Sequence, residues 1–160
     1  MPAGPGIRQD IKRADAATVA AARVLPAATL HEAGGRIGIM PSAIKPVSPA
    51  FRVCGPAVTV HSPGGDILAD FGFLVFARGL CIRDTGKDFG ARGWINHPVL
   101  FDDLTVDAGD LIVGDTDDVV AVPRARAAEV VVAATAREAK EVAIIKRIEG
   151  GERTLEVYNF

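Results

Sequence analysis

Hydrophobic and polar positions are most clearly patterned in the stretch LTVDAGDLIVGDTDDVVAVP, residues 104–123. Two runs rich in Val and Ile, residues 111–113 and 119–122, flank the polar turn GDTDD. Such runs around a Gly- and Asp-rich turn predict a β-hairpin. Pro123 then opens a long alanine-rich segment that lasts until a Gly-Gly pair, so we expect one helix over residues 123–149.

The N-terminal half predicts two short helices. Alanine-rich residues 10–24 favour a first helix, after residues 1–10, which look loose. The segment AATLHEAGGRIG predicts a second helix, with Thr29 as its N-cap, Glu32 completing a capping box and Gly34 marking its end.

Strand signals lie between these helices and the hairpin. β-branched residues alternate around residues 57–61, and FLVFARG, residues 73–79, is a compact apolar run typical of a buried strand. Helices mixed with buried strands and a hairpin predict an α/β fold. We expect one domain over residues 1–160, with residues 152–160 as a tail that docks on the body or on a neighbour.

Composition limits the function classes. The 160 residues are 49% hydrophobic and carry a formal net charge of -2, which suits one globular domain and gives no electrostatic footprint for nucleic acid. No secretory signal and no membrane-length apolar run is seen, so we expect a soluble, cytoplasmic protein that does not contact a membrane. Cys54 and Cys81 match no metal spacing; a disulfide stays open, although buried thiols are the preferred interpretation.

Candidate chemistry is sparse. His31, His61 and His97 have no ligand-like spacing, and structural histidines are favoured over catalytic ones. The GDTDD turn could hold a hard cation, but Asp also stabilises hairpin turns, and we prefer that interpretation. Arg83 beside Asp84 could clamp a carboxylate and hold a metal, or form an ordinary charged loop.

Glu138 and Glu141 lie on one face of the predicted long helix, and Arg137 pairs with Glu141 at i,i+4 spacing. Spacing alone favours a solvated, salt-bridged face. The functional alternative is that Glu141 projects across an oligomer interface and acts as a general acid or base.

Several blocks together resemble the regulator of ribonuclease activity A-like family, which includes the 4-hydroxy-4-methyl-2-oxoglutarate and 4-carboxy-4-hydroxy-2-oxoadipate aldolases. The most specific block is VDAGDLIVGDTDDVVAVPRARAAEVVVAA, in which Asp118 replaces the Gly usual in that turn. The others, in order, are TLHEAGGRIGIM (29–40), GPAVTV (55–60), GFLVFARG (72–79), INHPV (95–99) and AREAKE (136–141).

The resemblance implies an α/β/β swivelling-domain fold that assembles as trimers or hexamers with active sites between subunits. It implies a lyase that cleaves 4-hydroxy-2-oxo acids to pyruvate and often decarboxylates oxaloacetate, with Mg²⁺, or Mn²⁺ as the alternative, stabilising the enolate. It also implies site residues: Glu141 for proton transfer in a neighbouring subunit, and Gly65 with Asp66 in a substrate-cradling loop. Asp66 is the weak candidate for a metal contact.

The chain departs from the family in its centre. Only HSPGGDILAD separates the GPAVTV and GFLVFARG blocks, and the DGxxRD motif, which supplies substrate-binding Arg and metal-binding Asp, is absent. We therefore expect a fold shortened in the middle, with HSPGGDILADFGF as the junction and the metal ligands unknown. A metal-dependent aldolase is the favoured hypothesis. The alternative is a catalytically inactive scaffold or regulator that binds a ribonuclease or another protein.

Overall fold

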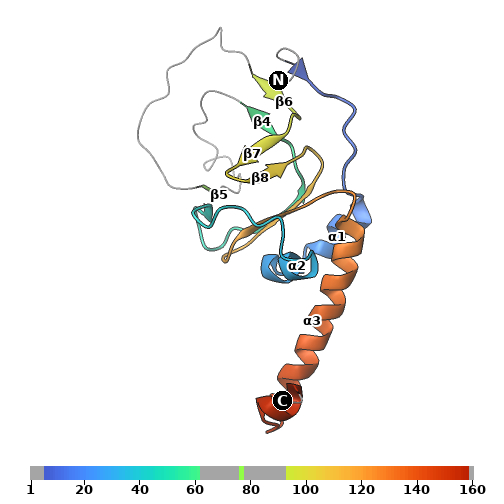
Figure 1. Ribbon diagram of the computed structural model, residues 1–160, viewed down its shortest axis with the longest axis vertical. Coiled ribbons are helices and arrows are strands. Elements are labelled where there is room, and N and C mark those ends of the chain that lie inside the picture. The colour runs from blue at the N-terminus through green and yellow to red at the C-terminus, as the bar shows by residue number, and fades with distance from the viewer. Residues whose placement is uncertain (1–5, 62–75, 78–92, 159–160) are drawn as a thin grey trace.

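In the computed structural model of the chain, residues 6–61, 76–77 and 93–158 are described (Figure 1). Helices and strands are mixed within these ranges, as expected for an α/β fold. In chain order the elements are β1 (Gly6–Ile7), α1 (Ala16–Ala22), α2 (Ala27–Ala33), β2 (Lys45–Pro46), β3 (Val53–Pro56), β4 (Val60–His61), β5 (Phe76–Ala77), β6 (Trp94–Ile95), β7 (Val99–Phe101), β8 (Leu104–Val106), β9 (Leu111–Gly114), β10 (Val119–Val122), α3 (Ala127–Glu149) and α4 (Thr154–Tyr158).

The predicted hairpin is confirmed and forms the central sheet. Strands β9 and β10 pair antiparallel, and β3 adds to the other edge of β9. Of the strand expected around residues 57–61, only residues 60 and 61 form a strand, β4, and β3 ends just before the expected start. Ala57 leaves the sheet because its N–H and C=O bond the 109–110 turn, and the Thr59 carbonyl accepts from the Asn96 backbone.

One core joins this sheet to α1, α2 and the first half of α3, which lie together on one side of it (Figure 1). Burying each large aliphatic side chain contributes roughly 1.5–3 kcal/mol. The largest fully buried side chains are Leu30, Leu111, Val113, Val120 and Val130.

Helix α1 begins at Ala16, whereas the composition predicted residue 10. Asp15 caps it by accepting hydrogen bonds from the backbone N–H (2.9 Å) and hydroxyl (2.6 Å) of Thr18. The preceding backbone is bound elsewhere, since the N–H of Ala14 donates to Gly109. Alanine content alone therefore extended the prediction too far.

Helix α2 ends at Gly34 as predicted, but its predicted N-cap is wrong. Thr29 lies inside the helix, and Pro26 occupies the N-cap position without a side-chain hydrogen bond. The Ala27 N–H donates instead to Asp115 Oδ2 at 2.8 Å, across 88 positions of sequence. The cap is therefore a tertiary contact.

Helix α3 begins at Ala127, four residues after the predicted start at Pro123. The Pro123 carbonyl accepts from Arg126 N–H, and Arg124 N–H is bound by Asp110, so residues 123–126 form a turn. The predicted end at Gly150 is confirmed.

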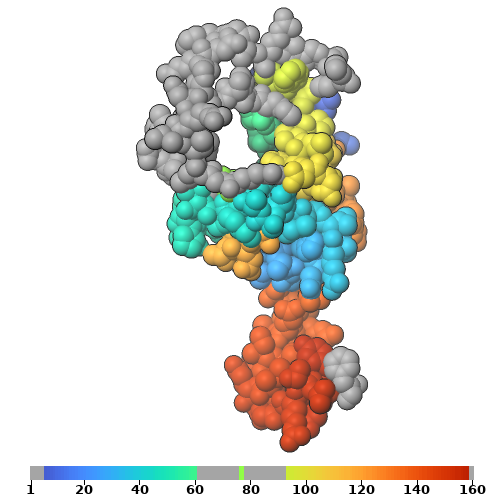
Figure 2. Space-filling model, turned by 60° about the vertical axis from the view of Figure 1, so that its left-hand side comes forward, coloured from blue at the N-terminus to red at the C-terminus, as the bar shows by residue number. Residues whose placement is uncertain are grey.

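The second half of α3 leaves the body. The buried residues of α3 all lie in its first eight positions, from Ala127 to Ala134, and the rest of the helix projects away together with α4 (Figures 1 and 2). The tail folds back on α3, with Val157 buried and Arg147 paired with Glu152. Among the described residues, no helix is both long enough and apolar enough to cross a lipid bilayer.

Short strands form the opposite end of the molecule. Strand β1 pairs in parallel with β6, so residues 6 and 7 have a partner within the segment expected to be loose. Strand β5 is half-buried and is the described part of the buried strand predicted over residues 73–79. The other residues of that prediction lie outside the described ranges.

Candidate functional site

Glu141 lies on the projecting part of α3. Its Oε1 is 2.9 Å from Nε of Arg137, so the predicted i,i+4 ion pair is present. Arg137 also pairs with Glu32 of α2. The Glu141 side chain is 44% exposed, which leaves the carboxylate open to a molecule approaching α3 from outside.

Glu138 serves a different purpose from Glu141. Its Oε1 accepts a hydrogen bond from the Thr29 hydroxyl at 2.5 Å, which ties α3 to α2. The two glutamates predicted to share a face are therefore separated in role. The Glu138 carboxylate is used in the hydrogen bond between α2 and α3. The Glu141 carboxylate is half-exposed, and its ion-pair partner among the described residues is Arg137.

The GDTDD turn has the structural role preferred from the sequence. Asp115 Oδ1 accepts from Asp117 N–H at 3.1 Å, its Oδ2 caps α2, and Asp118 pairs with Lys45. Within the described ranges, no group of three or more His, Cys, Asp or Glu side chains is placed to hold a metal ion.

The described residues also include the three histidines and Cys54. His97 is buried, and its Nδ1, like Nε2 of His31, has no hydrogen-bond partner among the described residues. His61 contributes backbone pairing in β4. Cys54 carries a free thiol 3.5 Å from the Val19 carbonyl, and burial raises its pKa, which agrees with the preferred interpretation of a packed thiol.

The remaining predicted site residues lie outside the described residues. These are the cradle candidates Gly65 and Asp66, the pair Arg83 and Asp84, and Cys81. They remain predictions, as does the metal role of Asp66.

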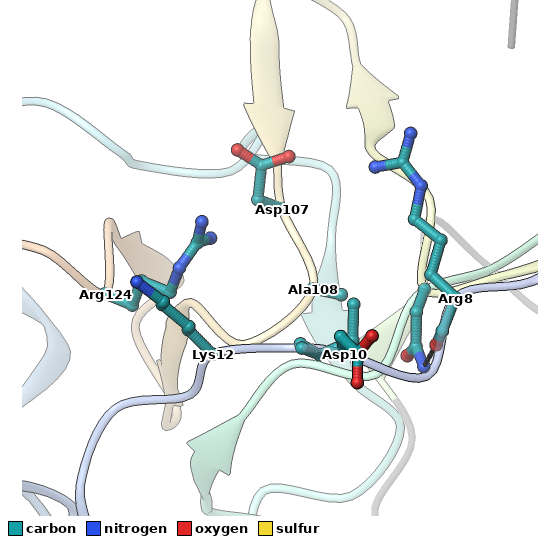
Figure 3. Close-up of a pocket in the computed structure, with 8 residues that line it drawn as sticks. Arg8, Asp10, Lys12, Asp107, Ala108 and Arg124 are labelled. Carbon is teal, nitrogen blue, oxygen red and sulfur yellow. Dashed lines mark hydrogen bonds between the residues drawn. The ribbon is translucent and has the colours of Figure 1, made fainter.

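The structure reveals a cavity that the sequence did not indicate. It has a volume of about 370 Å³ and lies where the N-terminal segment crosses the turn before β9 (Figure 3). Its lining brings together residues distant in sequence, which carry no shared motif. They are Arg8, Asp10, Ile11, Lys12, Asn96, Asp107, Ala108 and Arg124.

Asp110 organises one side of this cavity. Its Oδ2 accepts from Asp107 N–H at 3.0 Å and its Oδ1 from Arg124 N–H at 2.9 Å, with the Arg124 Nη1 at 3.7 Å. The VDAGD turn is thereby fixed to the turn that precedes α3. Nothing in the sequence pattern indicated that Asp110 would hold a cavity wall.

Comparison with solved structures shows what the fold resembles. A protein described as uncharacterized, from Pseudomonas syringae pv. tomato str. DC3000, matches with a TM-score of 0.75 and 23% identity, covering 94% of this chain and 97% of that one. Streptomyces coelicolor RraAS2, described as an unusual member of the RNase ES inhibitor RraA protein family, matches with a TM-score of 0.67 and 18% identity. That alignment covers 84% of this chain and 100% of RraAS2.

A third structure, described as novel cellulases from microbes associated with the gut ecosystem, has a TM-score of 0.62 and 18% identity, covering 88% of this chain and 92% of that one. At identities this low, the three matches show a similar fold and nothing more. The family model RraA-like: Aldolase/RraA matches residues 65–121, which include β9 and all of β10 except its last residue. The matched segment and the shared fold support an RraA-like family assignment.

Proposed function

We propose that the chain is a divalent-metal-dependent aldolase that cleaves 4-hydroxy-2-oxo acids of the 4-hydroxy-4-methyl-2-oxoglutarate type, releases pyruvate and decarboxylates oxaloacetate. The observation that carries this proposal is the position of Glu141. The family model and RraAS2 carry the names of two activities, aldolase and ribonuclease inhibitor. The exposed Glu141 carboxylate on the projecting helix supports the first.

Exposed apolar side chains follow Glu141 on its face of α3. Ile145 and Ile148 follow Glu141 at i+4 and i+7, so the three residues share one face of α3. The two isoleucines are 53% and 41% exposed. Large apolar side chains on a helix that has left its own core support packing against another chain. We propose a homo-oligomer, a trimer or hexamer, in which this face carries Glu141 to a neighbouring active site.

The chemistry of a retro-aldol step assigns Glu141 a proton-transfer role. The carboxylate takes the proton of the 4-hydroxyl as the C3–C4 bond breaks, and the electron pair of that bond forms the enolate of pyruvate. The same proton then goes to C3 of the enolate, which restores the carboxylate. Arg137, bound to both Glu32 and Glu141, holds the carboxylate in orientation.

Magnesium, or manganese, enters the proposal through family resemblance. Within the part of the chain that is described, the side chains do not form a set that fits a divalent ion. No step is therefore assigned to the metal. The proposed contact between Asp66 and the metal ion is tested by substitution in the experiment below.

The test measures pyruvate release by the purified chain. The pyruvate is detected continuously through a coupled lactate dehydrogenase reaction. With Mg²⁺, oxaloacetate and 4-hydroxy-4-methyl-2-oxoglutarate should both yield pyruvate above the uncatalysed rate, and EDTA should abolish the increase. Asp66→Asn should reduce the rate, whereas Asp103→Asn, at a loop position, should not. A folded, oligomeric, metal-loaded sample that releases no pyruvate from either substrate would refute the aldolase.

The second candidate is a regulator that binds a ribonuclease. The absent DGxxRD motif and the full coverage of RraAS2 favour it. It predicts that the immobilised chain retains a purified ribonuclease of the RNase E class at moderate salt. Failure to retain that ribonuclease, in a sample that does release pyruvate, excludes the regulator.

A further inference from the structure

The cavity beside the N-terminal segment has a pre-formed wall. We define residues 8–14 as the N-terminal strap. At one end, Arg8 N–H donates to the Ile95 carbonyl at 3.2 Å, and Asn96 Nδ2 donates to the Arg8 carbonyl at 2.7 Å. At the other end, Ala14 N–H donates to Gly109 at 3.1 Å. The strap is therefore fixed on both sides of the cavity that it lines.

Close contact with Gly109 also fixes the strap. Gly109 has φ +93°, and a Cβ at this position would lie 2.0 Å from the Lys12 carbonyl oxygen. Only glycine allows this approach, which brings Lys12 over the turn held by Asp110. Figure 3 shows Lys12 beside Arg124, with Asp107 above them and Arg8 farther along the strap. The lining is thus held by backbone contacts.

The charged lining is mixed but has an excess of cations. Arg8, Lys12 and Arg124 contribute positive charge, against the carboxylates of Asp10 and Asp107. Arg124 is also paired with Asp110 at 3.7 Å, so Arg8 and Lys12 are the cations available to a ligand. Within the described ranges, neither Arg8 nor Lys12 forms an ion pair with a carboxylate. Two cationic side chains at a cavity therefore have hydrogen-bond donors to offer an anion.

The acceptors show what else a ligand must carry. Ionised Asp10 and Asp107 accept hydrogen bonds but donate none, and their negative charge would repel an anion that has no donor groups. Asn96 adds a buried Oδ1 that lacks a donor among the described residues. This oxygen is covered in the structure, so a ligand reaches it only if the side chain turns toward the cavity. Hydroxyl groups satisfy such acceptors.

We propose that this cavity binds a small organic anion that also carries hydroxyl groups. The phosphate or carboxylate of the ligand contacts Arg8 and Lys12, and its hydroxyls donate to Asp10 and Asp107. A volume of about 370 Å³ lies in the range of small-molecule sites. The proposal goes beyond the aldolase and does not rest on it.

The experiment titrates the full chain with four probes by isothermal calorimetry and protein NMR: glucose 6-phosphate, gluconate, glucose and inorganic phosphate. Glucose 6-phosphate or gluconate should bind with a dissociation constant on the order of 1 mM or below. Tighter binding of glucose 6-phosphate would show that the site prefers a phosphate, and tighter binding of gluconate would show that it prefers a carboxylate. Glucose and inorganic phosphate should bind at least roughly tenfold more weakly, since each lacks half of the contacts. If neither hydroxylated anion binds, or inorganic phosphate binds as tightly, the proposal is wrong.

Variants locate the binding. Arg8 and Lys12 are exposed, so Arg8→Gln and Lys12→Gln should fold, and each should weaken the tighter probe roughly tenfold. Lys140→Gln, which removes an exposed positive charge on α3, is the matched control and should leave the affinity unchanged. Unchanged affinity in both strap variants would overturn the proposal. Glu141→Gln should bind the probe normally, so failure of this site and failure of the aldolase are distinguishable.

Discussion

Replacing Asp115 by Ala should destabilise the fold by removing a helix cap that comes from the hairpin. Asp115 Oδ2 accepts from Ala27 N–H at 2.8 Å at the start of α2, and Oδ1 accepts from Asp117 N–H at 3.1 Å within its own turn. The side chain is only 13% exposed, and Arg52 Nη1 lies 3.7 Å from Oδ2. The substitution leaves the Ala27 N–H without its acceptor.

The magnitude follows from these contacts. Loss of a helix N-cap costs about 1 kcal/mol. The hydrogen bond within the turn contributes about 1 kcal/mol. The ion pair with Arg52 adds less than about 1 kcal/mol, because that arginine is 39% exposed and 3.7 Å away. Neighbouring contributions are not fully additive, so we expect a loss of about 2–3 kcal/mol in the free energy of unfolding.

Urea unfolding followed by circular dichroism, at one fixed protein concentration, measures this loss. Thermal unfolding should show Tm lower by about 4–12 °C. The control is Asp118→Ala, which removes a 2.8 Å ion pair to Lys45 between side chains that are 33% and 47% exposed. That variant should lose less than about 1 kcal/mol. Equal stability of the Asp115→Ala and Asp118→Ala variants would refute the tertiary cap.

Two further predictions concern backbone shape and charge. Gly38→Ala should destabilise by at least about 2 kcal/mol more than Gly35→Ala in urea unfolding. Both glycines have positive φ. At Gly38 a Cβ would lie 2.1 Å from a carbonyl oxygen of β10, whereas at Gly35 nothing lies within 4 Å. Equal losses of stability in the two variants would contradict this prediction. The pKa of Asp15 is lowered from 3.8, chiefly by the hydroxyl hydrogen bond from Thr18 and then by its backbone N–H. Its folded pKa is below its unfolded pKa, so its stabilising contribution is present above the unfolded value and is lost as pH falls through the folded one. Asp15→Asn should therefore show a smaller loss of stability on acidification than wild type, and identical acid profiles would show that the cap does not titrate.

Local pattern predicted the parts of the fold that depend on neighbours in sequence. The hairpin of β9 and β10 was predicted because its strands and turn are contiguous. Gly34 and Gly150 marked helix ends correctly, since a C-terminal stop is set by the residue that stands there. Helix starts were less predictable. The cap of α2 comes from Asp115, and residues 123–126 form a turn because Asp110 binds Arg124.

In the candidate site too, contacts between residues near in sequence were predictable and contacts between distant segments were not. The ion pair of Arg137 with Glu141 follows from i,i+4 spacing and was predicted. The cavity was not predicted, because it brings Arg8 and Lys12 to Asp107 and Arg124 from segments about a hundred residues apart. The parallel pairing of β1 with β6 places the strap there. A parallel pair of two residues has no periodicity that a sequence could display.

The central claim is that Glu141 performs proton transfer in a pyruvate-releasing aldolase. The most direct test is kcat for pyruvate release from 4-hydroxy-4-methyl-2-oxoglutarate with Mg²⁺, compared between wild type, Glu141→Gln and Glu149→Gln. Glu149 is an exposed glutamate on the same helix and serves as the matched control. We predict a fall of roughly 10²–10⁴-fold for Glu141→Gln, the usual contribution of a general acid or base, with the oligomer intact and Glu149→Gln at the wild-type rate. A Glu141→Gln variant that releases pyruvate as fast as wild type would contradict the claim.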